Sequence, residues 1–319
     1  MNKKVIIFSG PTATGKTALS IKSALEIEKI TSQECCIINF DSLAFYKELL
    51  IGSARVTQEQ MQGVEHHLVG TESIKEPVDA HQFIKLAQEI IENNPHKVFI
   101  FVGGSGFYIR ALIKGMYETT DIDSQLKDQL NELYQAQGIS PFISFLKEND
   151  PETLQTLHAN DHYRILRAVE FYKANNQKIS EFKKLSDKND PYDFTQNMHP
   201  NWDILHIYLD IPRAEHFEII EKRTEGMIQD GLIEEVKQLL QEGFTGQERP
   251  LQSIGYKEAQ DFIEGKFKNL EELSERISIS TRQLAKAQRT FFKKVKGKET
   301  FNPLSENDDV LNTVKNFIK

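Results

Sequence analysis

The chain contains two cysteines and no long apolar segment. Cys35 and Cys36 are adjacent among 319 residues, so they offer no disulfide framework, and they lack the spacing of a metal site. No segment approaches the roughly 18 consecutive apolar residues that a membrane helix needs. The first four residues lead directly into a strand-like segment and not into the apolar core of a signal peptide. We expect a cytoplasmic globular protein with no membrane partner.

Basic residues are fewer than acidic ones, 39 against 47, which gives a formal net charge of −8. Such a charge, taken alone, argues against a nucleic-acid partner. The distribution of charge matters more, because basic residues can gather on one surface. The segment 282–298 has no acidic residue, and we favour a phosphate-contacting surface over an ordinary solvated helix face. Its basic residues are Arg282, Lys286, Arg289, Lys293, Lys294, Lys296 and Lys298.

Short apolar segments alternate with helical patterns along most of the chain. Continuous apolar runs are typical of strands that are buried on both faces. Strands that alternate with helices predict a parallel sheet with helices on both faces, which is the α/β class. The predicted strands are 5–9, 35–40, 97–102 and 204–209, and the clearest helices between them are 17–28 and 80–92.

A region rich in glutamine, asparagine and lysine interrupts this alternation. Strand-like segments are absent between residues 121 and 199. We interpret 121–199 as a helical insertion into a core formed by 1–120 and 200–319. The sequence predicts helices over 124–137, 140–148, 161–175 and 270–296, and a loop over 183–200.

A phosphate-binding loop is the strongest single signal. The pattern Gly-x-x-x-x-Gly-Lys-Thr follows the first predicted strand and opens the first predicted helix, as in P-loop NTPases. Its glycines let backbone N–H groups turn toward an anion, and the helix N-terminus adds a favourable dipole. Lys16 would neutralise phosphate charge and Thr17 would ligate Mg²⁺; the alternative is a chance match. The loop comprises Gly10, Pro11, Thr12, Ala13, Thr14, Gly15, Lys16 and Thr17.

Polar residues also follow the second and third predicted strands. Asp41 ends the second strand and Gly103-Gly104-Ser105 ends the third, at the edge where open α/β sheets bind ligands. An aspartate there is more often a cap or turn residue, so catalysis is the less common outcome. His66-His67 lacks partners at metal-ligand spacing, and we interpret it as structural. No Walker B strand is evident, so the phosphate loop does not by itself establish ATP hydrolysis.

Taken together, these segments resemble the bacterial tRNA dimethylallyltransferases, also called tRNA isopentenyltransferases. The resemblance extends through most of the chain, and its motifs occur in the family's order. Ser105 stands where the family usually has threonine, so a hydroxyl is kept. The matching segments are Gly10–Thr17, Asp41–Lys47 with Ile51–Arg55, Val102–Tyr108, His158–Glu170, Gly255–Glu258 and Thr281–Gln288.

The resemblance implies an enzyme that transfers a dimethylallyl group from its diphosphate to N6 of adenine 37, beside the tRNA anticodon. It implies that the phosphate loop, with Arg223 or Arg282, holds the diphosphate of the prenyl donor, together with Mg²⁺ on Thr17. Asp41 would be the general base, Ser105 would orient the amine or stabilise the leaving group, and Lys16 would neutralise its charge. We expect the enzyme to act as a monomer.

The resemblance also implies which residues contact tRNA. A stacked adenine cannot reach such a site, so it should be flipped out of the anticodon loop. We expect Tyr46, Phe107 and Tyr108 to be candidates for lining its path, with core packing as the alternative for each. The implied tRNA-contacting residues are Asp41, Ser42, Leu43, Ala44, Ser105, Lys127, Tyr163, Arg164, Arg167, Gly255, Tyr256, Lys257 and Lys286.

Three other functions share parts of this pattern. A P-loop kinase for a small molecule would have the same fold and first motif. An enzyme that prenylates a free adenine nucleotide would need no large basic insertion. A nucleotide-gated binding module would need no acid at a strand end.

Overall fold

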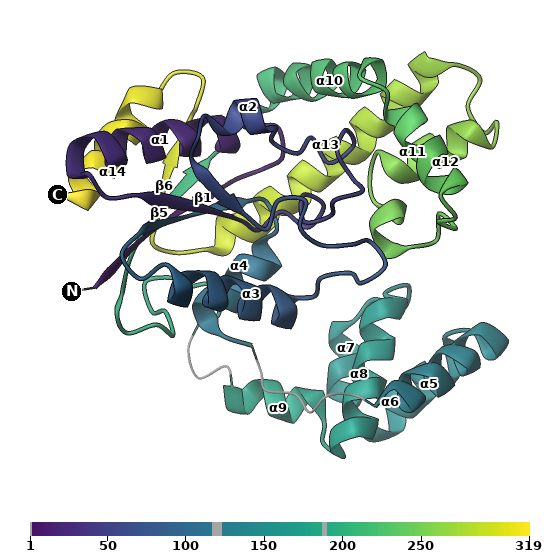
Figure 1. Ribbon diagram of the computed structural model, residues 1–319. Helices are drawn as coiled ribbons and strands as arrows, with labels where there is room; N and C mark the ends of the chain where they lie inside the picture. Colours follow the sequence, from purple (N-terminus) through teal and green to yellow (C-terminus); the bar gives the residue numbers. More distant parts are fainter. Residues whose placement is uncertain (1, 117–122, 187–189) are drawn as a thin grey trace. The chain divides into compact units, whose positions relative to one another are not determined.

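The computed structural model describes residues 2–116, 123–186 and 190–319 (Figure 1). The chain divides into two compact units, one formed by Met1–Gly115 with Tyr192–Lys319 and the other by Met116–Pro191. The predicted start of the insertion at residue 121 lies outside the described residues. The predicted end at 199 was too late, because residues 192–199 belong to the first unit.

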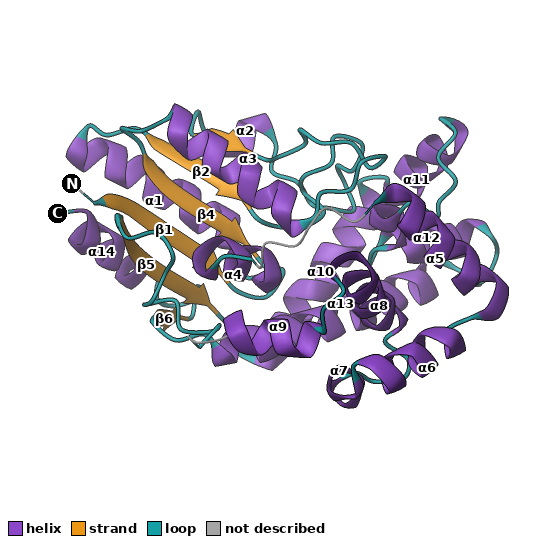
Figure 2. Cartoon of the chain, turned by 90° about the horizontal axis from the view of Figure 1, so that it is seen from below, coloured by secondary structure: helices purple, strands orange, loops and turns teal. Residues whose placement is uncertain are grey.

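The first unit is built on one six-stranded sheet in which all paired strands are parallel (Figure 2). The strand order is β3-β2-β4-β1-β5-β6. The four predicted strands are confirmed, whereas β3 and β6 were missed because they are short and carry mostly polar residues. The strands are β1 (Lys3–Ser9), β2 (Cys35–Asn39), β3 (Glu65–His67), β4 (Val98–Gly103), β5 (Trp202–Leu209) and β6 (Lys298–Phe301).

Helices cover both faces of the sheet, as the alternation predicts (Figure 1). Helices α1 (Lys16–Thr31) and α14 (Asn307–Ile318) pack on one face, where Ile6 and Phe8 of β1 contribute to the core. Helices α3 (Ala80–Asn93) and α4 (Gly106–Lys114) pack on the other, where the core includes Val5 and Ile7. Neighbouring residues of β1 therefore serve opposite faces, because side chains alternate along a strand.

The longest helix of the first unit is α13 (Leu270–Lys294), and it packs against α10 (Arg213–Gln229). Asn269 caps its first turn by accepting a hydrogen bond from Glu272 N–H at 2.9 Å. Acidic residues in the first turn and lysines in the last turn stabilise the helix, because their charges are opposite to those of the helix dipole at each end. The remaining elements are α2 (Gln58–Met61), α11 (Leu232–Gln241), the short 3₁₀ helix Arg249–Gln252 and α12 (Tyr256–Ile263).

The second unit is helical and has its own core, which includes Leu130, Phe142, Leu146 and Ile165. Its predicted helices are confirmed, whereas the predicted loop over 183–200 was wrong at its start, because a helix continues to Ser186. The helices are α5 (Ser124–Gln137), α6 (Ser140–Asn149), α7 (Pro151–Thr156), α8 (His162–Asn175) and α9 (Ile179–Ser186).

Within the described ranges, no helix combines the length and apolarity that crossing a bilayer requires.

Candidate active site at the carboxyl edge of the sheet

The phosphate loop connects β1 to α1 and has the backbone of an anion-binding turn. Gly10 has φ 150°, and a Cβ atom there would lie 2.2 Å from the carbonyl oxygen of Leu209, so only glycine fits. Ala13 and Gly15 have φ 62° and 76°. Gly15 precedes α1 with no side-chain cap, so the first amides of the helix are left for a ligand.

Lys16 is almost buried, with 9% of its surface exposed, and its ammonium donates to the carbonyl oxygen of Pro11 at 2.6 Å. Burial lowers the pKa of Lys16 to about 8, while the charge of Asp41 raises it and that of Arg223 lowers it further. Burial also lowers the pKa of Arg223, and Asp41 opposes this effect. The three charged groups therefore lie close enough to act on one another.

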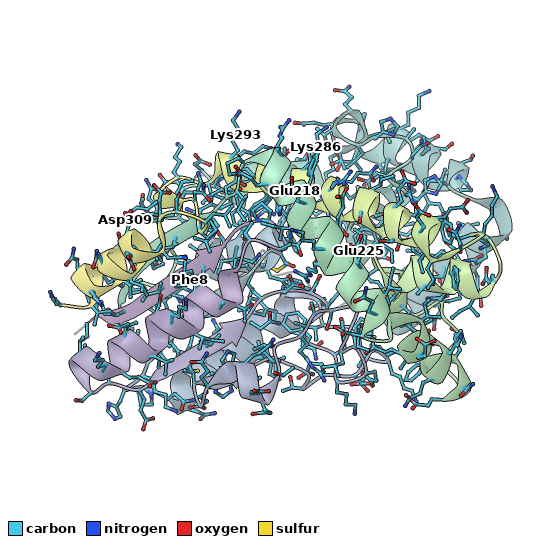
Figure 3. All side chains as sticks on the ribbon, turned by 90° about the horizontal axis from the view of Figure 1, so that it is seen from above. Phe8, Glu218, Glu225, Lys286, Lys293 and Asp309 are labelled. Carbon is cyan, nitrogen blue, oxygen red and sulfur yellow. The ribbon has the colours of Figure 1, made fainter. Side chains whose placement is uncertain are left out.

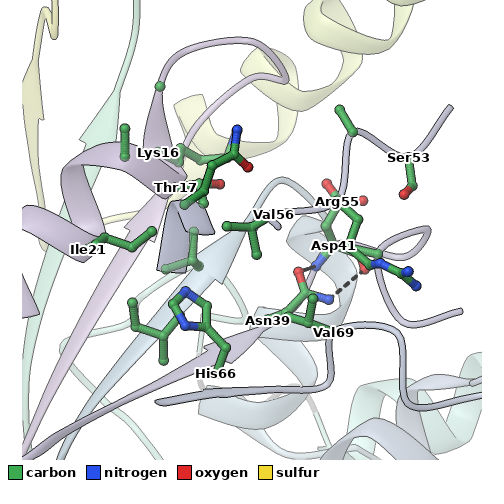
Figure 4. A pocket seen from close by; sticks show the side chains of 18 of the residues that line it. Lys16, Thr17, Ile21, Asn39, Asp41, Ser53, Arg55, Val56, His66 and Val69 are labelled. Atoms are coloured by element: carbon green, nitrogen blue, oxygen red, sulfur yellow. Dashed lines mark hydrogen bonds between the residues drawn. The ribbon is translucent and has the colours of Figure 1, made fainter. Parts of the chain in front are cut away.

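A cavity of about 430 Å³ opens beside the loop (Figure 4). Lys16 and Thr17 lie on one side of it, and Asp41, Ser53 and Arg55 on the other. Its polar lining thus combines several cations with one carboxylate. The cations suit an anionic ligand, and the carboxylate suits a reaction in which a proton is transferred. The apolar part of the lining comes from Ile21, Ile37, Val56, Val69 and Val102.

Strand order brings the predicted catalytic residues to one edge, because β4 lies between β1 and β2. Ser105 follows β4 and accepts a hydrogen bond from Ser42 N–H at 3.2 Å, so the loops after β2 and β4 are joined. Asn39 holds the backbone of Asp41 through bonds of 2.9 and 3.1 Å, shown as dashed lines in Figure 4. Of the other two residues in this loop, Ala44 lines the cavity and Leu43 packs on the core.

The Asp41 carboxylate has a turn-forming role as well as access to the cavity. Its Oδ1 accepts the N–H of Leu43 at 3.2 Å, which is the local bond expected of an aspartate after a strand. In the described part of the chain, Oδ2 has no hydrogen-bond partner. One oxygen thus orients the side chain, and the other is available to accept a proton.

The two arginines predicted to bind the diphosphate occupy different places. Arg223, from α10, lines the cavity, whereas Arg282 lines neither this cavity nor the smaller one on the outer side of the loop. Arg282 instead forms an ion pair with Glu221 and stacks over Phe217 at 4.6 Å. The structure thus places Arg223, and not Arg282, in the lining of the cavity beside the phosphate loop.

His66, which the sequence suggested was structural, also lines the cavity. Its Nδ1 lies 2.8 Å from the carbonyl oxygen of Val64, so Nδ1 carries the proton. The other ring nitrogen, Nε2, is buried and has no hydrogen-bond partner among the described residues. Burial lowers the pKa of the His66 imidazole. His66 therefore presents a neutral acceptor at the apolar wall. No sequence signal distinguishes this histidine from its neighbour.

Cys36, Glu65 and His67 converge within 4.8 Å and are the one group of possible metal ligands that the described residues contain. Burial raises the pKa of the Cys36 thiol to about 12, which keeps it protonated in the metal-free protein. Lys97 forms an ion pair with Glu65 and supplies positive charge there. We assign these residues to the packing of β2 and β3.

Helix α13 supports the phosphate loop from behind. The side chain of Gln288 accepts the N–H of Thr12 at 2.8 Å and donates to the carbonyl oxygen of Gly104 at 3.1 Å. One residue thereby joins the phosphate loop to the loop that carries Ser105. A Cβ atom at Gly104 would lie 2.3 Å from this amide, which explains the glycine.

A buried histidine provides a second support. His216 Nε2 lies 2.8 Å from the carbonyl oxygen of Thr12, and His216 Nδ1 lies 2.7 Å from a guanidinium nitrogen of Arg289. Because Arg289 can only donate, Nε2 must carry the ring proton and donate to the loop. Asp210 orients Arg289 in turn, at 2.7 Å. Arg289 was therefore wrongly assigned to the basic surface.

The rest of the basic segment is partly exposed. Lys286 and Lys293 point outward from α13, and Figure 3 shows Glu218 and Glu225 on the neighbouring α10. Lys298 is half-buried and donates to a backbone carbonyl at 2.6 Å. The cationic surface is therefore smaller than the sequence suggests, because two of its members are used internally and α10 adds acidic groups alongside.

The segment Gly255–Lys257 has a structural place. Tyr256 is fully buried and donates to Glu235 at 2.6 Å, so its predicted contact with tRNA is wrong for the side chain. Gly255 is buried and Lys257 pairs with Asp261 at 2.7 Å. Tyr46 is also buried and Tyr108 packs on the same aromatic core, which leaves Phe107 as the exposed member of that predicted set.

The helical unit carries the other predicted tRNA contacts. Lys127 on α5 is exposed, as is Tyr163 on α8, whose exposed fraction is 59%. Arg164 and Arg167 are exposed and pair with Asp161 and Glu170 at 2.8 and 2.7 Å. The Arg164–Asp161 pair is exposed and contributes little to stability, so Arg164 can exchange its partner for a phosphate, whereas Glu170 is buried and holds Arg167 more firmly.

Comparison with known sequences gives a consistent result. Residues 44–295 match the family model described as IPP transferase. The chain is 34% identical to a tRNA dimethylallyltransferase of Trichlorobacter lovleyi over 92% of both chains. It is 36% identical to the tRNA dimethylallyltransferase of Carboxydothermus hydrogenoformans over the whole length of both.

Solved structures agree. The tRNA delta(2)-isopentenylpyrophosphate transferase of Staphylococcus epidermidis is 31% identical, with a TM-score of 0.67 over 99% of both chains. A eukaryotic dimethylallyltransferase captured while acting on tRNA is 26% identical, with a TM-score of 0.76 over 96% of this chain and 76% of that one.

Proposed function

Because the chain belongs to the IPP transferase family, we propose that it transfers a dimethylallyl group from dimethylallyl diphosphate to N6 of adenine 37 in tRNA. The observation that supports this most directly is the cavity in which the phosphate loop, Arg223, an apolar wall and Asp41 meet. The diphosphate suits the first two, the five-carbon group suits the wall, and the amine suits the carboxylate. Since the acceptor is tRNA, the proposal includes a cytoplasmic location.

The reaction follows from these positions. The N6 nitrogen attacks C1 of the dimethylallyl group, the C1–O bond breaks, and its electron pair leaves with the diphosphate. The free oxygen of Asp41 accepts the proton that N6 loses, a contribution of roughly 10²- to 10⁴-fold. Lys16 and Arg223 neutralise the charge that develops on the leaving group.

Mg²⁺ is part of the proposal. Thr17 is the first-turn hydroxyl of α1, exposed and on the cavity wall, which is where a P-loop protein ligates this ion. The ion would neutralise diphosphate charge when bound. Lys16 and the loop amides bind the same oxygens.

The test is a transfer assay with labelled dimethylallyl diphosphate, Mg²⁺ and either unmodified tRNA or AMP. We expect label in tRNA alone. Label in AMP would indicate the free-nucleotide enzyme. Label in neither, with transfer from labelled ATP to a metabolite, would establish a kinase and refute the proposal.

The role of Asp41 is tested with Asp41→Asn, which keeps the shape and removes the base. We expect turnover to fall by at least roughly 10²-fold while dimethylallyl diphosphate still binds. The matched control is Asp203→Asn. Asp203 lies near the amino end of β5, away from the edge of the sheet that carries the site, and its carboxylate pairs with Lys4. Unchanged turnover in Asp41→Asn would exclude the general-base role of Asp41.

A further inference from the structure

A cluster of aromatic and basic side chains lies next to the acceptor side of the site. Phe107 is the second residue of α4, and 51% of it is exposed. Its Cα lies two residues from that of Ser105, hence no more than about 8 Å away. Among the large hydrophobic residues that lie exposed in the described part of the chain, Phe107 and Tyr163 are the two aromatic ones.

Basic groups accompany this ring. The guanidinium carbon of Arg110 lies 5.4 Å from the ring centre of Phe107 and 5.8 Å from that of Tyr192. The ammonium of Lys294 lies 5.3 Å from the ring of Tyr192. Among residues 2–116, 123–186 and 190–319, no carboxylate forms an ion pair with Arg110 or Lys294.

The cluster is held in place by packing against the start of α4. Phe291 contacts Tyr192 edge-to-face, with ring centres 5.5 Å apart. A Cβ atom at Gly106 would lie 2.2 Å from the ring of Phe291, so this glycine allows the helix and the ring to meet. Three segments that are distant in sequence thereby form one platform.

We propose that Phe107 and Arg110 form a stacking platform for an unpaired nucleobase next to the modified adenine, with Lys294 contacting a phosphate of that strand. This inference rests on the proposed function. An exposed ring beside unpaired cations suits a planar base on an anionic backbone, because every base has a face that can stack and every phosphate a charge. A purely apolar partner would leave both cations without compensation.

The prenyl donor is not the ligand of this platform. None of Phe107, Arg110 and Lys294 lines either cavity beside the phosphate loop. The platform therefore affects the acceptor RNA and leaves donor binding unchanged, a difference that kinetics can separate.

The experiment uses the full-length protein and a synthetic anticodon stem-loop that keeps its acceptor adenine. At saturating donor, Phe107→Ala should lower kcat/KM for the RNA roughly 5- to 100-fold, whereas KM for dimethylallyl diphosphate stays within about twofold. Phe107→Trp should restore the rate. Ile30→Ala, at a residue 43% exposed in the last turn of α1, is the matched control and should change nothing.

Stem-loops with an abasic nucleotide on one side or the other of the adenine identify the stacked base. With the correct base removed, Phe107→Ala should have no further effect, because the interaction is already lost. Equal effects of Phe107→Ala on both abasic RNAs and the intact one would overturn the platform, as would a wild-type rate in Phe107→Ala.

Salt dependence tests the phosphate contact. Lys294→Gln should reduce the slope of log affinity against log salt concentration by roughly 0.7, and Lys29→Gln at the far end of α1 should not. An unchanged slope would remove Lys294 from the proposal. Should the wild type transfer nothing to any RNA, the proposed function fails, and binding of the same stem-loop to Phe107→Ala still decides the platform.

Discussion

Replacing the buried lysine of the phosphate loop should make the ligand-free protein more stable. The pKa of Lys16 falls from its ordinary 10.5 to about 8 because its ammonium is removed from water. A shift of this size corresponds to about 3 kcal/mol against the charged form at pH 7. Lys16→Met removes the charge and keeps the length, so unfolding should require up to about 3 kcal/mol more, while diphosphate affinity is lost.

The sign of the pH dependence follows from linkage. Between pH 8 and 10.5 the unfolded wild type holds the Lys16 proton and the folded one does not, so wild-type stability rises with pH. The advantage of Lys16→Met should therefore shrink from about 3 kcal/mol at pH 7 to below about 1 kcal/mol at pH 10.

Urea unfolding of both proteins at several pH values measures this difference. Lys22→Met is the matched control, because Lys22 is exposed on the same helix, and its effect should stay within about 0.5 kcal/mol. An advantage that is absent at pH 7, or that stays constant with pH, would refute the reasoning.

Three further predictions concern packing and support. Gln288→Ala removes both hydrogen bonds that support the phosphate loop. Since each bond contributes about 1 kcal/mol, dimethylallyl diphosphate binding should weaken roughly 5- to 30-fold by calorimetry; exposed Gln283→Ala on the same helix should leave it unchanged. Gly52→Ala places a Cβ atom 2.6 Å from the buried ring of Tyr256 and should lower the free energy of unfolding by about 1–3 kcal/mol. The control, Gly226→Ala, adds its Cβ atom in open space within a helix and should raise the free energy of unfolding. An unchanged free energy in Gly52→Ala would show that the tyrosine ring moves aside. Burial lowers the pKa of His206 to about 3, so below pH 6.5 the unfolded state binds a proton that the folded state does not. The free energy of unfolding of the wild type should therefore fall by about 1.4 kcal/mol per pH unit relative to that of His206→Phe. Parallel plots of unfolding free energy against pH for the two proteins would contradict this.

The sequence determined most of the fold because its signals are local. Apolar runs of five or six residues ending at Ser9 or Asp41 predict buried parallel strands, and only such strands need to be apolar on both faces. Strand β3 was not predicted because it has only three residues, which are polar and pair with β2 through backbone atoms. This pairing sets His66 beside Ile37, and both residues line the cavity.

The phosphate loop and Asp41 were likewise evident from the sequence, since each needs a particular residue type at a particular strand end. Arg223 and Arg282 could not be separated in the same way. Both are basic residues within helices, and the packing of α10 on α13 decides which one lines the cavity.

The sequence by itself thus determined the sheet, the phosphate loop and the acid at the strand end, because backbone geometry and burial impose those residue types locally. Only the tertiary structure decided that Arg289 and Tyr256 serve the interior and that Phe107 stays exposed beside Arg110. These outcomes depend on contacts between segments far apart in the chain, for which the pattern along one helix carries no information.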